Sequence, residues 1–469
     1  MTQQIVDTPP QTSERLTEAL ARFVCELDYA SLPASVVDRI KVYTLDCLAC
    51  GFVGALQPWS HMVRELVQEA GGTSEASCFC TPKRTTMAQA ALVNGVMIGG
   101  FESEHIGWNA HPSGTVFPAA FALAEAGHKS GKEFITAMAA GYELVCRIGE
   151  AQTGAVEIER GFHNPSVNGV YGAAAAAGLL LHFDLPAMLN ALGVAGSHSA
   201  GIVEYAWNGE MTKRLHLGRA AQWGLESALL AQKGFTGPAT ILEGRYGFFH
   251  AFSPRPHPER LLHDLGKRWL LETLTIKAYP CHATCQAIVG AIQAFKREHR
   301  FDPHTVQRVV VRAGEETAQD RYWNRAPDSM MAAQYSVPFS AAVALYRDLD
   351  DPANYDESVL ADAGIRRLAA AFEPVHDASP ELEARGMADM ELTIGGQTHR
   401  IAARTFKGSL AEPLSFADAE DKFRRFTRSV LSEREQTAIV DRVRRLERLT
   451  KVRSLAKLIR DRWGDRLSK

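Results

Sequence analysis

Apolar residues recur at a spacing of three and four positions through most of the first half of the chain, which is the period of an α-helix. Helices are predicted over residues 12–24, 31–51, 60–72, 130–151 and 170–183. The first opens on capping residues, and the second has Pro33 in its first turn and is expected to end at Gly51. Because these helices are rich in Ala and Gly, they are expected to approach one another closely in one core.

The pattern changes near residue 270. Residues 274–280 (LTIKAYP) and 307–314 (QRVVVRAG) are short apolar or β-branched runs that predict strands. Residues 390–405 alternate in two runs joined by Gly395 and Gly396, which predicts a hairpin. A helical pattern between the strands, at 285–299, makes this an α+β region.

Three parts follow from these patterns: helices in 1–269, an α+β domain in 270–405, and helices again in 406–469. The pattern alone leaves open whether the last helices pack on the first domain or form a tail. A chain of 469 residues is too long for one ordinary core, which also favours two domains.

Composition excludes several classes of protein. A hydrophobic content of 46% and a charged content of 22% are typical of globular proteins, and a net charge of −3 argues against nucleic-acid binding. The one basic run, within 440–463, is interleaved with acids. No secretory signal or membrane-length apolar stretch is present, so a cytoplasmic protein with no membrane partner is expected.

Eight cysteines are expected to be reduced thiols. Cys47 and Cys50 form a C-x-x-C pair, but it lies in an apolar helical pattern and no second pair sits at zinc-site spacing. Core packing is therefore favoured over a redox or zinc site.

Residues 101–114 (FESEHIGWNAHPSG) crowd titratable groups before a buried helix. Ser113 or Gly114 is expected to cap that helix, and its N-terminus would favour an anion. A histidine beside an anion suits general acid or base catalysis. We expect four side chains of this segment to reach one wall of a cleft: Glu102, Glu104, His105 and His111.

Four more stretches have the same character. Residues 160–176 repeat the pattern of a histidine, a Pro-Ser turn and an apolar helix, with His163 before Asn-Pro-Ser. In 204–224, Lys213 and Arg214 follow a polar loop and precede a helix, and Lys213 suits a substrate carboxylate. The remaining two, 276–287 at the expected domain junction and 326–342, contribute Lys277, His282 and Tyr335.

Each residue alone has a simpler explanation. A histidine at a helix start is more often a cap or a hydrogen-bonded core group. A metal site from Glu102, His105 and His111 is conceivable but matches no tight ligand motif, and no G-x-S-x-G, Walker or G-x-G-x-x-G motif occurs. The residues by themselves indicate a helical enzyme that binds a small anion with His and Lys.

Taken together and in order, the motifs resemble the MmgE/PrpD family, from about Leu16 to about Phe423. The matching segments are NGVMIGGFESEH, HPSGTVFPAAFALAE, GYELVCRIG, GFHNPSVNGVYGAAAAAGLLL, TKRLHLGRAAQWGLESALLAQKGFTGP, KAYPCHATCQAI and AAQYSVPFSAAVAL. The resemblance implies a large helical domain built from N- and C-terminal segments, a smaller α+β lid, and an active site between them. It also implies a homodimer that needs no metal or organic cofactor.

The resemblance assigns site residues position by position. The implied catalytic residues are His111, His163, Lys213, Lys277 and His282. Substrate contacts are expected from Glu102, Glu104, His105, Ser113, Arg214 and Tyr335. Cations would hold carboxylates, and a histidine would move the proton next to one.

One segment departs from the family pattern. Many members have roughly HALDYDDT where this chain has Gly99–Ile106. The first aspartate becomes Glu102, the third becomes His105, and the threonine becomes Ile106. A longer carboxylate and a lost hydroxyl predict a wall of different shape and polarity.

The leading hypothesis is a lyase that acts on a small di- or tricarboxylate by proton transfer next to a carboxylate, with 2-methylcitrate dehydration favoured. A cis-aconitate-type decarboxylase and an iminodisuccinate-type epimerase are the alternatives within the family. Two alternatives from other functional classes are a catalytically inactive family member that serves as a binding or scaffold protein, suggested by the altered segment, and a metal-dependent hydrolase.

Overall fold

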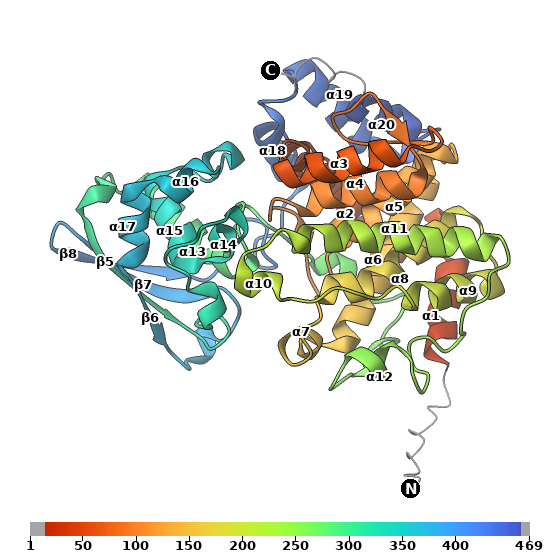
Figure 1. The fold of residues 1–469 in the computed structure, drawn as a ribbon, viewed down its shortest axis with the longest axis horizontal. Coiled ribbons are helices and arrows are strands. Elements are labelled where there is room, and N and C mark those ends of the chain that lie inside the picture. The colour runs from red at the N-terminus through yellow and green to blue at the C-terminus, as the bar shows by residue number, and fades with distance from the viewer. Residues whose placement is uncertain (1–14, 461–469) are drawn as a thin grey trace, which may run out of the picture.

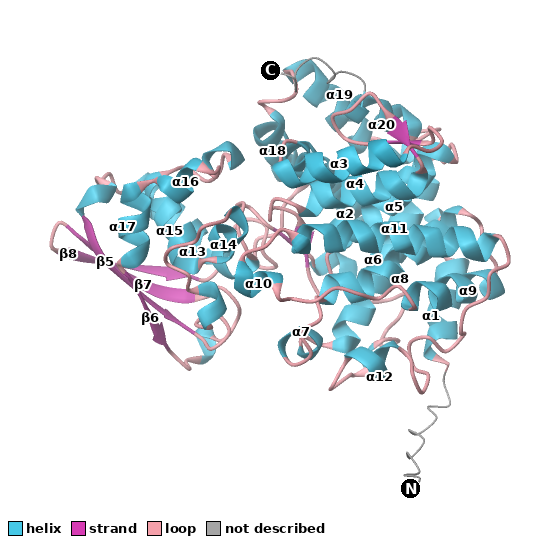
Figure 2. Cartoon of the chain, in the orientation of Figure 1, coloured by secondary structure: helices cyan, strands magenta, loops and turns pink. Residues whose placement is uncertain are grey.

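The computed structural model describes residues 15–460, which form a large helical domain and a smaller domain built on a β-sheet (Figures 1 and 2). This arrangement confirms the predicted mainly helical fold with an α+β second domain. The first predicted helix is α1 (Leu16–Glu26), and its expected capping residues lie outside the described residues. Among the described residues no single helix is long and apolar enough to cross a membrane. Within the described residues, one pair of helices is long and apolar enough when counted together: α2 (Ala34–Ala55) and α3 (Pro58–Ala70), which are bent by 87° relative to each other.

The helical domain surrounds helices that are buried on nearly every side, as expected for the centre of a large core. Its helices are α1, α2 (Ala34–Ala55), α3 (Pro58–Ala70), α4 (Met87–Gly99), α5 (Pro112–Ala126), α6 (Gly131–Gln152), α7 (Ala155–Ile158), α8 (Asn164–Leu180), α9 (Leu185–Gly196), α10 (Tyr205–Asn208), α11 (Thr212–Gln232), α12 (Phe248–Phe252), α18 (Phe416–Thr427), α19 (Glu433–Arg444) and α20 (Arg453–Arg460). Two short strands, β1 (Ala76–Ser77) and β2 (Arg84–Thr85), pair beside them.

Glycines let the central helices meet where the site is built. A Cβ added to Gly95 of α4 would lie 2.7 Å from both the Gly114 oxygen of α5 and the Gly218 Cα of α11. Larger residues would separate these helices. The expected helix end at Gly51 is wrong for the same reason: α2 continues to Ala55, and a Cβ on Gly51 would lie 2.4 Å from the Phe79 ring. Gly51 is a packing position, not a stop.

The smaller domain has a four-stranded sheet of order β6-β5-β7-β8, in which only the β5–β6 pair is parallel. Its strands are β5 (Val306–Ala313), β6 (Phe372–His376), β7 (Ala388–Ile394) and β8 (Gln397–Ala403), and its helices are α13 (Gln286–Glu298), α14 (Met330–Tyr335), α15 (Val337–Tyr346), α16 (Ser358–Ala361) and α17 (Ala363–Ala370). The predicted hairpin is confirmed: Gly395 and Gly396 have φ of 56° and 83° between β7 and β8. Residues 279–403 are called the lid domain below.

A two-residue ladder holds the chain to the helical domain just before the lid domain begins. The predicted strand at 274–280 is shorter than expected: β4 (Thr275–Ile276) pairs antiparallel with β3 (His105–Ile106) of the helical domain. Beyond it the chain leaves the strand, because the N–H groups of Ala278 and Tyr279 donate to the Gln286 side chain at 2.9 and 3.1 Å.

The C-terminal helices return to the helical domain, which answers the question that the pattern left open. α18 packs on α2, and Phe423 and Phe426 enter the helical core (Figure 1). Cys47 and Cys50 lie buried in the same core without a disulfide. Burial raises the pKa of both thiols well above the ordinary value. The packing interpretation of this pair is confirmed.

Candidate active site

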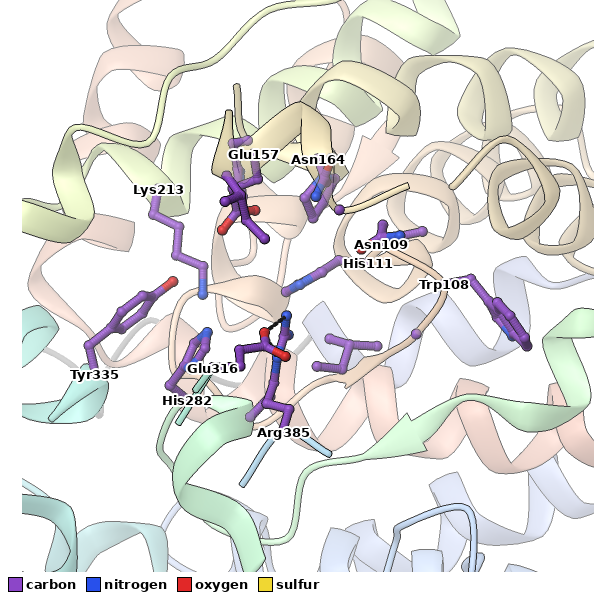
Figure 3. A pocket seen from close by; sticks show the side chains of 18 of the residues that line it. Trp108, Asn109, His111, Glu157, Asn164, Lys213, His282, Glu316, Tyr335 and Arg385 are labelled. Atoms are coloured by element: carbon purple, nitrogen blue, oxygen red, sulfur yellow. Dashed lines mark hydrogen bonds and ion pairs between the residues drawn. The ribbon is translucent and has the colours of Figure 1, made fainter. Parts of the chain in front are cut away.

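A cavity of about 340 Å³ lies where the helical and lid domains meet (Figure 3). One side is formed by the starts of three helices, and the other by the loops that follow β4 and β5. All five residues assigned as catalytic line it, and Tyr335 does so too. They come from segments that are widely separated in the sequence: His111, His163, Lys213, Lys277 and His282.

Two of the three helix starts place a histidine in the cavity wall in the same way. α5 and α8 each have a proline in the first turn, preceded by a histidine whose side chain makes no capping bond. His111 and His163 lie in the cavity wall instead. The expectation that Ser113 caps α5 is wrong, because its Oγ donates to the His105 oxygen at 3.0 Å. Lys213, expected before its helix, lies in the first turn of α11.

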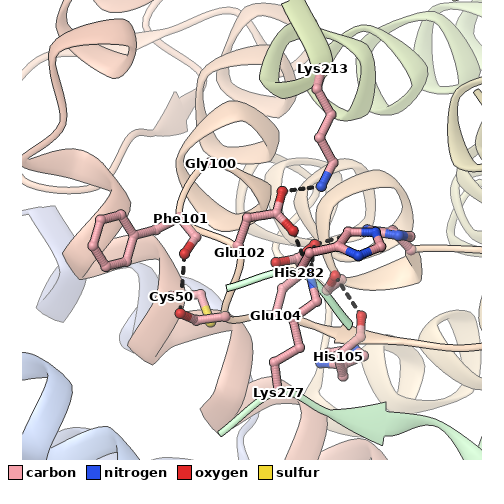
Figure 4. A network of polar contacts seen from close by, with 12 residues as sticks. Cys50, Gly100, Phe101, Glu102, Glu104, His105, Lys213, Lys277 and His282 are labelled. Atoms are coloured by element: carbon pink, nitrogen blue, oxygen red, sulfur yellow. Dashed lines mark hydrogen bonds and ion pairs between the residues drawn. The ribbon is translucent and has the colours of Figure 1, made fainter. Parts of the chain in front are cut away.

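Glu102 bridges two lysines from different parts of the chain (Figure 4). Its Oε1 accepts from Lys213, and its Oε2 accepts from Lys277 Nζ at 2.8 Å. All three side chains are buried. Glu102 has a φ of 55°, an uncommon value for a non-glycine residue that is typical of functional sites. The glutamate thereby fixes both ammonium groups at the cavity.

Glu104 orients His111. Its Oε1 accepts the Nδ1–H of His111 at 2.8 Å and also accepts from Lys277 Nζ at 3.3 Å. Burial alone raises the pKa of Glu104, but Lys277 and the His111 hydrogen bond bring it down to about 2. Burial likewise opposes ionisation of Glu102, and Lys213 and Lys277 hold its pKa well below the ordinary value. With Nδ1 bound to an ionised carboxylate, His111 keeps Nε2 for a ligand.

The cavity histidines are neutral at pH 7 in this arrangement. Burial lowers the pKa of His111 to about 4 against the opposing effect of Glu104. Burial lowers the pKa of His163 well below its ordinary value, assisted by His216, whose Nδ1 lies 3.2 Å from Nδ1 of His163. Burial also lowers the pKa of His282, which packs on the Tyr335 ring at 4.4 Å. A bound anion would favour the protonated form of each ring.

Of the six predicted substrate contacts, Tyr335 lines the cavity, whereas Glu102 and Glu104 lie behind the lysines and the histidine that they bind. The other three lie deeper behind the wall. His105 is fully buried, with Nδ1 2.7 Å from Asp46 and Nε2 3.0 Å from the Tyr142 hydroxyl. Arg214 donates to the Gly100 oxygen at 2.8 Å and stacks on a tryptophan. Neither these two residues nor Ser113 lines the cavity. Their hydrogen bonds support the segment that carries Glu102 and Glu104.

A buried lysine joins this support to the site. Lys422 of α18 donates to Asp46 at 2.6 Å, to the Ser103 oxygen at 2.6 Å and to the Lys277 oxygen at 2.8 Å. The backbone carrying Glu102 and Glu104 and the backbone of Lys277 are thus held by one ammonium group. Helix α18 therefore contributes to the position of cavity residues although it does not line the cavity.

Four charged lining residues were missed by sequence reasoning. They are Glu157, Glu316, Arg321 and Arg385, and all but the first lie in the lid domain. One signal in the sequence pointed to Glu316 and Arg321: the charge-rich segment GEETAQDR at 314–321 directly follows the apolar strand β5. Glu157 and Arg385 had no comparable signal.

The side chains considered as a metal site do not converge. His105 binds Asp46, whereas His111 binds Glu104. Within residues 15–460, no group of three or more His, Cys, Asp or Glu side chains is arranged to hold a metal ion.

Comparison with protein families accounts for both domains. A model of the MmgE/PrpD N-terminal domain matches residues 18–261, and a model of the MmgE/PrpD C-terminal domain matches residues 279–448. The chain belongs to the MmgE/PrpD family. The resemblance inferred from the motifs is thus confirmed.

Relatives of this MmgE/PrpD protein bear on its chemistry. It is 28% identical to the cis-aconitate decarboxylase of Mus musculus over 95% of this chain and 93% of that protein. It is 27% identical to the cis-aconitate decarboxylase of Aspergillus terreus over 98% of both chains. A cis-aconitate decarboxylase-like protein of Aspergillus oryzae, oryM, is 30% identical over 66% of this chain and 68% of that protein. The prediction of a lyase or isomerase of this family is confirmed, whereas the 2-methylcitrate dehydratase prediction is not.

Proposed function

We propose that this protein is a carboxy-lyase that removes CO₂ from a small unsaturated tricarboxylate of the cis-aconitate type. The observation that carries the proposal is the cavity in which three histidines and two lysines converge on buried glutamates. Cationic and imidazole side chains suit a substrate that carries several carboxylates and needs one proton transfer. The decarboxylase names of its relatives favour this reaction over dehydration.

Decarboxylation of cis-aconitate releases one CO₂ and takes up one proton. When the –CH₂–COO⁻ arm of cis-aconitate releases CO₂, the electron pair of the broken C–C bond forms a new C=C bond. The old double bond then shifts its pair onto the carbon next to another carboxylate. That carbon takes up a proton, and the product is methylenesuccinate.

His111 is the proton donor in this proposal. Its Nδ1 is held by Glu104, so its Nε2 faces the substrate. The low pKa of His111 in this structure means that substrate binding must raise it, and the carboxylates of the substrate provide the negative charge that does so. An imidazolium with a poised pKa is an effective acid near neutral pH.

Lys213 and Lys277 stabilise the negative charge that develops as CO₂ leaves. Glu102 fixes both ammonium groups, so little reorganisation accompanies the reaction. The glutamate at this position, in place of the family's aspartate, reaches further and brings both lysines onto one carboxylate. The homodimer implied by the resemblance and the cytoplasmic location expected from the sequence stay predictions.

The test is a substrate panel assayed by proton NMR and CO₂ release. Cis-aconitate, 2-methylcitrate and iminodisuccinate are each incubated with purified protein and with a His111→Ala variant. We expect CO₂ release from cis-aconitate by the unchanged protein and a loss of about 10²- to 10⁴-fold in the variant. Turnover of 2-methylcitrate or iminodisuccinate alone would replace this proposal by a hydro-lyase or an epimerase, and inactivity with all three would favour the scaffold hypothesis.

A further inference from the structure

The lid side of the cavity carries a second pair of cations, Arg321 and Arg385, which the chemistry above does not use. We propose, resting on the proposed function, that these two arginines form the receptor for the distal carboxylate of a tricarboxylate substrate, with Glu157 and Glu316 occupying them until the substrate arrives. Figure 3 shows Arg385 and Glu316 paired within the cavity.

The helical side cannot supply this receptor. Lys213 and Lys277 are already bound by Glu102 and Glu104, and both glutamates are at most 1% exposed. These carboxylates have no route to solvent, so both lysines stay paired with them and offer a substrate only the N–H donors that the glutamates leave free. A third substrate carboxylate therefore needs cations whose present partners can leave.

The lid pairs meet that requirement. The side chain of Glu316 is 29% exposed and that of Glu157 is 24% exposed, so both carboxylates can turn to solvent. Ion pairs with such exposure contribute little to stability and exchange readily. Replacing one carboxylate on each guanidinium by a substrate carboxylate keeps the arginine charge compensated.

In the present ion pairs, the two arginines do not make full use of their N–H donors. Arg385 directs two nitrogens, Nε at 2.6 Å and Nη2 at 2.5 Å, to a single oxygen of Glu316. An arginine fork binds best when each nitrogen meets its own carboxylate oxygen. Arg321 pairs with Glu157 at 3.5 Å and lies over the Tyr322 ring, and its buried Nε has no hydrogen-bond partner within residues 15–460. Both guanidinium groups therefore gain hydrogen bonds from an incoming carboxylate.

The position of these residues couples recognition to the domain interface. Glu157 lies on α7 of the helical domain, whereas Arg321 follows β5 in the lid domain. A tricarboxylate would thus bridge the domains, with two carboxylates near the lysines and one on the arginines. A dicarboxylate that lacks the distal group would reach only the lysine side.

The experiment measures binding rather than turnover. Propane-1,2,3-tricarboxylate, which has no double bond to shift, is compared by titration calorimetry with 2-methylsuccinate, which lacks one terminal carboxylate. The variants are Arg385→Gln, Arg321→Gln and Glu316→Gln. Arg308→Gln is the matched control, because Arg308 is an exposed lid arginine paired with Glu373 away from the cavity.

We expect the tricarboxylate to lose about 10- to 100-fold in affinity in Arg385→Gln and in Arg321→Gln, as for loss of a charge-assisted hydrogen bond. Binding of 2-methylsuccinate should stay within twofold in every variant, and Arg308→Gln should match the unchanged protein for both ligands. Glu316→Gln should bind the tricarboxylate more tightly, since its competitor has lost its charge. That gain is a result that misfolding cannot produce.

Two results would overturn the receptor. If the arginine variants weaken both ligands equally or neither, the distal carboxylate is bound elsewhere, while the proposed function stands. If the unchanged protein binds neither ligand, the carboxylate substrate class fails, and the receptor fails with it.

Discussion

Replacing Glu104 by glutamine removes one negative charge beside His111 and changes little else. The amide oxygen can still accept the His111 Nδ1–H, now 2.8 Å from Oε1. The amide nitrogen would take the place of Oε2, a buried oxygen that has no hydrogen-bond partner in the described part of the chain. Lys277 retains Glu102 at 2.8 Å. The variant therefore tests the charge of Glu104 separately from its shape.

The magnitude follows from the loss of one charge-assisted hydrogen bond. Such a bond contributes about 1.5–3 kcal/mol, and each factor of ten in proton affinity corresponds to about 1.4 kcal/mol. The carboxylate favours the imidazolium, so its loss lowers the proton affinity of His111 about 10- to 100-fold. If protonated His111 delivers the proton, kcat at pH 7 falls by the same factor. The pH above which activity declines also moves down.

The assay is the pH dependence of kcat for CO₂ release from cis-aconitate. Glu125→Gln is the matched control, because Glu125 is equally buried and accepts two hydrogen bonds from Ser77 but does not line the cavity. This control should lose stability and keep the pH profile of the unchanged protein. An unaltered profile in Glu104→Gln, or the same alteration in both variants, would refute the role given to Glu104.

Three further predictions concern stability and the cavity wall. Lys422→Met leaves the buried Asp46 without its lysine and should lower the free energy of unfolding in urea by about 3–5 kcal/mol; a loss below about 1 kcal/mol would contradict the bridging role. Because the folded state holds the pKa of His111 at about 4, below its ordinary 6.5, that histidine's contribution to stability is complete above pH 6.5 and declines as the pH falls from 6.5 towards 4. Between pH 7.5 and 4.5, this residue should account for a decline on the order of 3 kcal/mol in the free energy of unfolding in urea, and His111→Gln should lack that share of the decline. In Gly149→Ala the new Cβ would lie 1.8 Å from the backbone oxygen of Trp108, which lines the cavity, so the cavity wall must move. We expect kcat/KM to fall about 100-fold. Unchanged kinetics would show that the position of Trp108 does not shape the site.

Local sequence signals predicted the parts of the fold that short-range physics decides. The hairpin at Gly395 and Gly396 was predictable because only residues that tolerate positive φ fit that turn. The helix starts after His111 and His163 were predicted too late, at Ser113 or Gly114 and at residue 170, because the prolines that lie in the first turns of α5 and α8 were interpreted as parts of turns. Gly51 misled the prediction, because its role depends on Phe79, a residue from another segment.

The choice of ion-pair partners could not be predicted from spacing. Glu102 finds its lysines 111 and 175 residues further along the chain. His105 looked like a cavity residue, but Asp46 from the apolar helix α2 holds it in the core. The sequence pattern left open whether α18 packs on the first domain, and nothing in it indicated that Lys422 would reach the active-site backbone. Such pairings depend on tertiary packing, which brings together charges that no local pattern relates.

Proton NMR of the purified protein with cis-aconitate in D₂O tests the central claim most directly. The proton on His111 exchanges with solvent, so the account predicts CO₂ loss and methylenesuccinate with one deuterium in its saturated CH₂ group. The rate of CO₂ release should fall about 10²- to 10⁴-fold in His111→Ala. Unchanged cis-aconitate, or a product that retains all three carboxylates, would contradict the account.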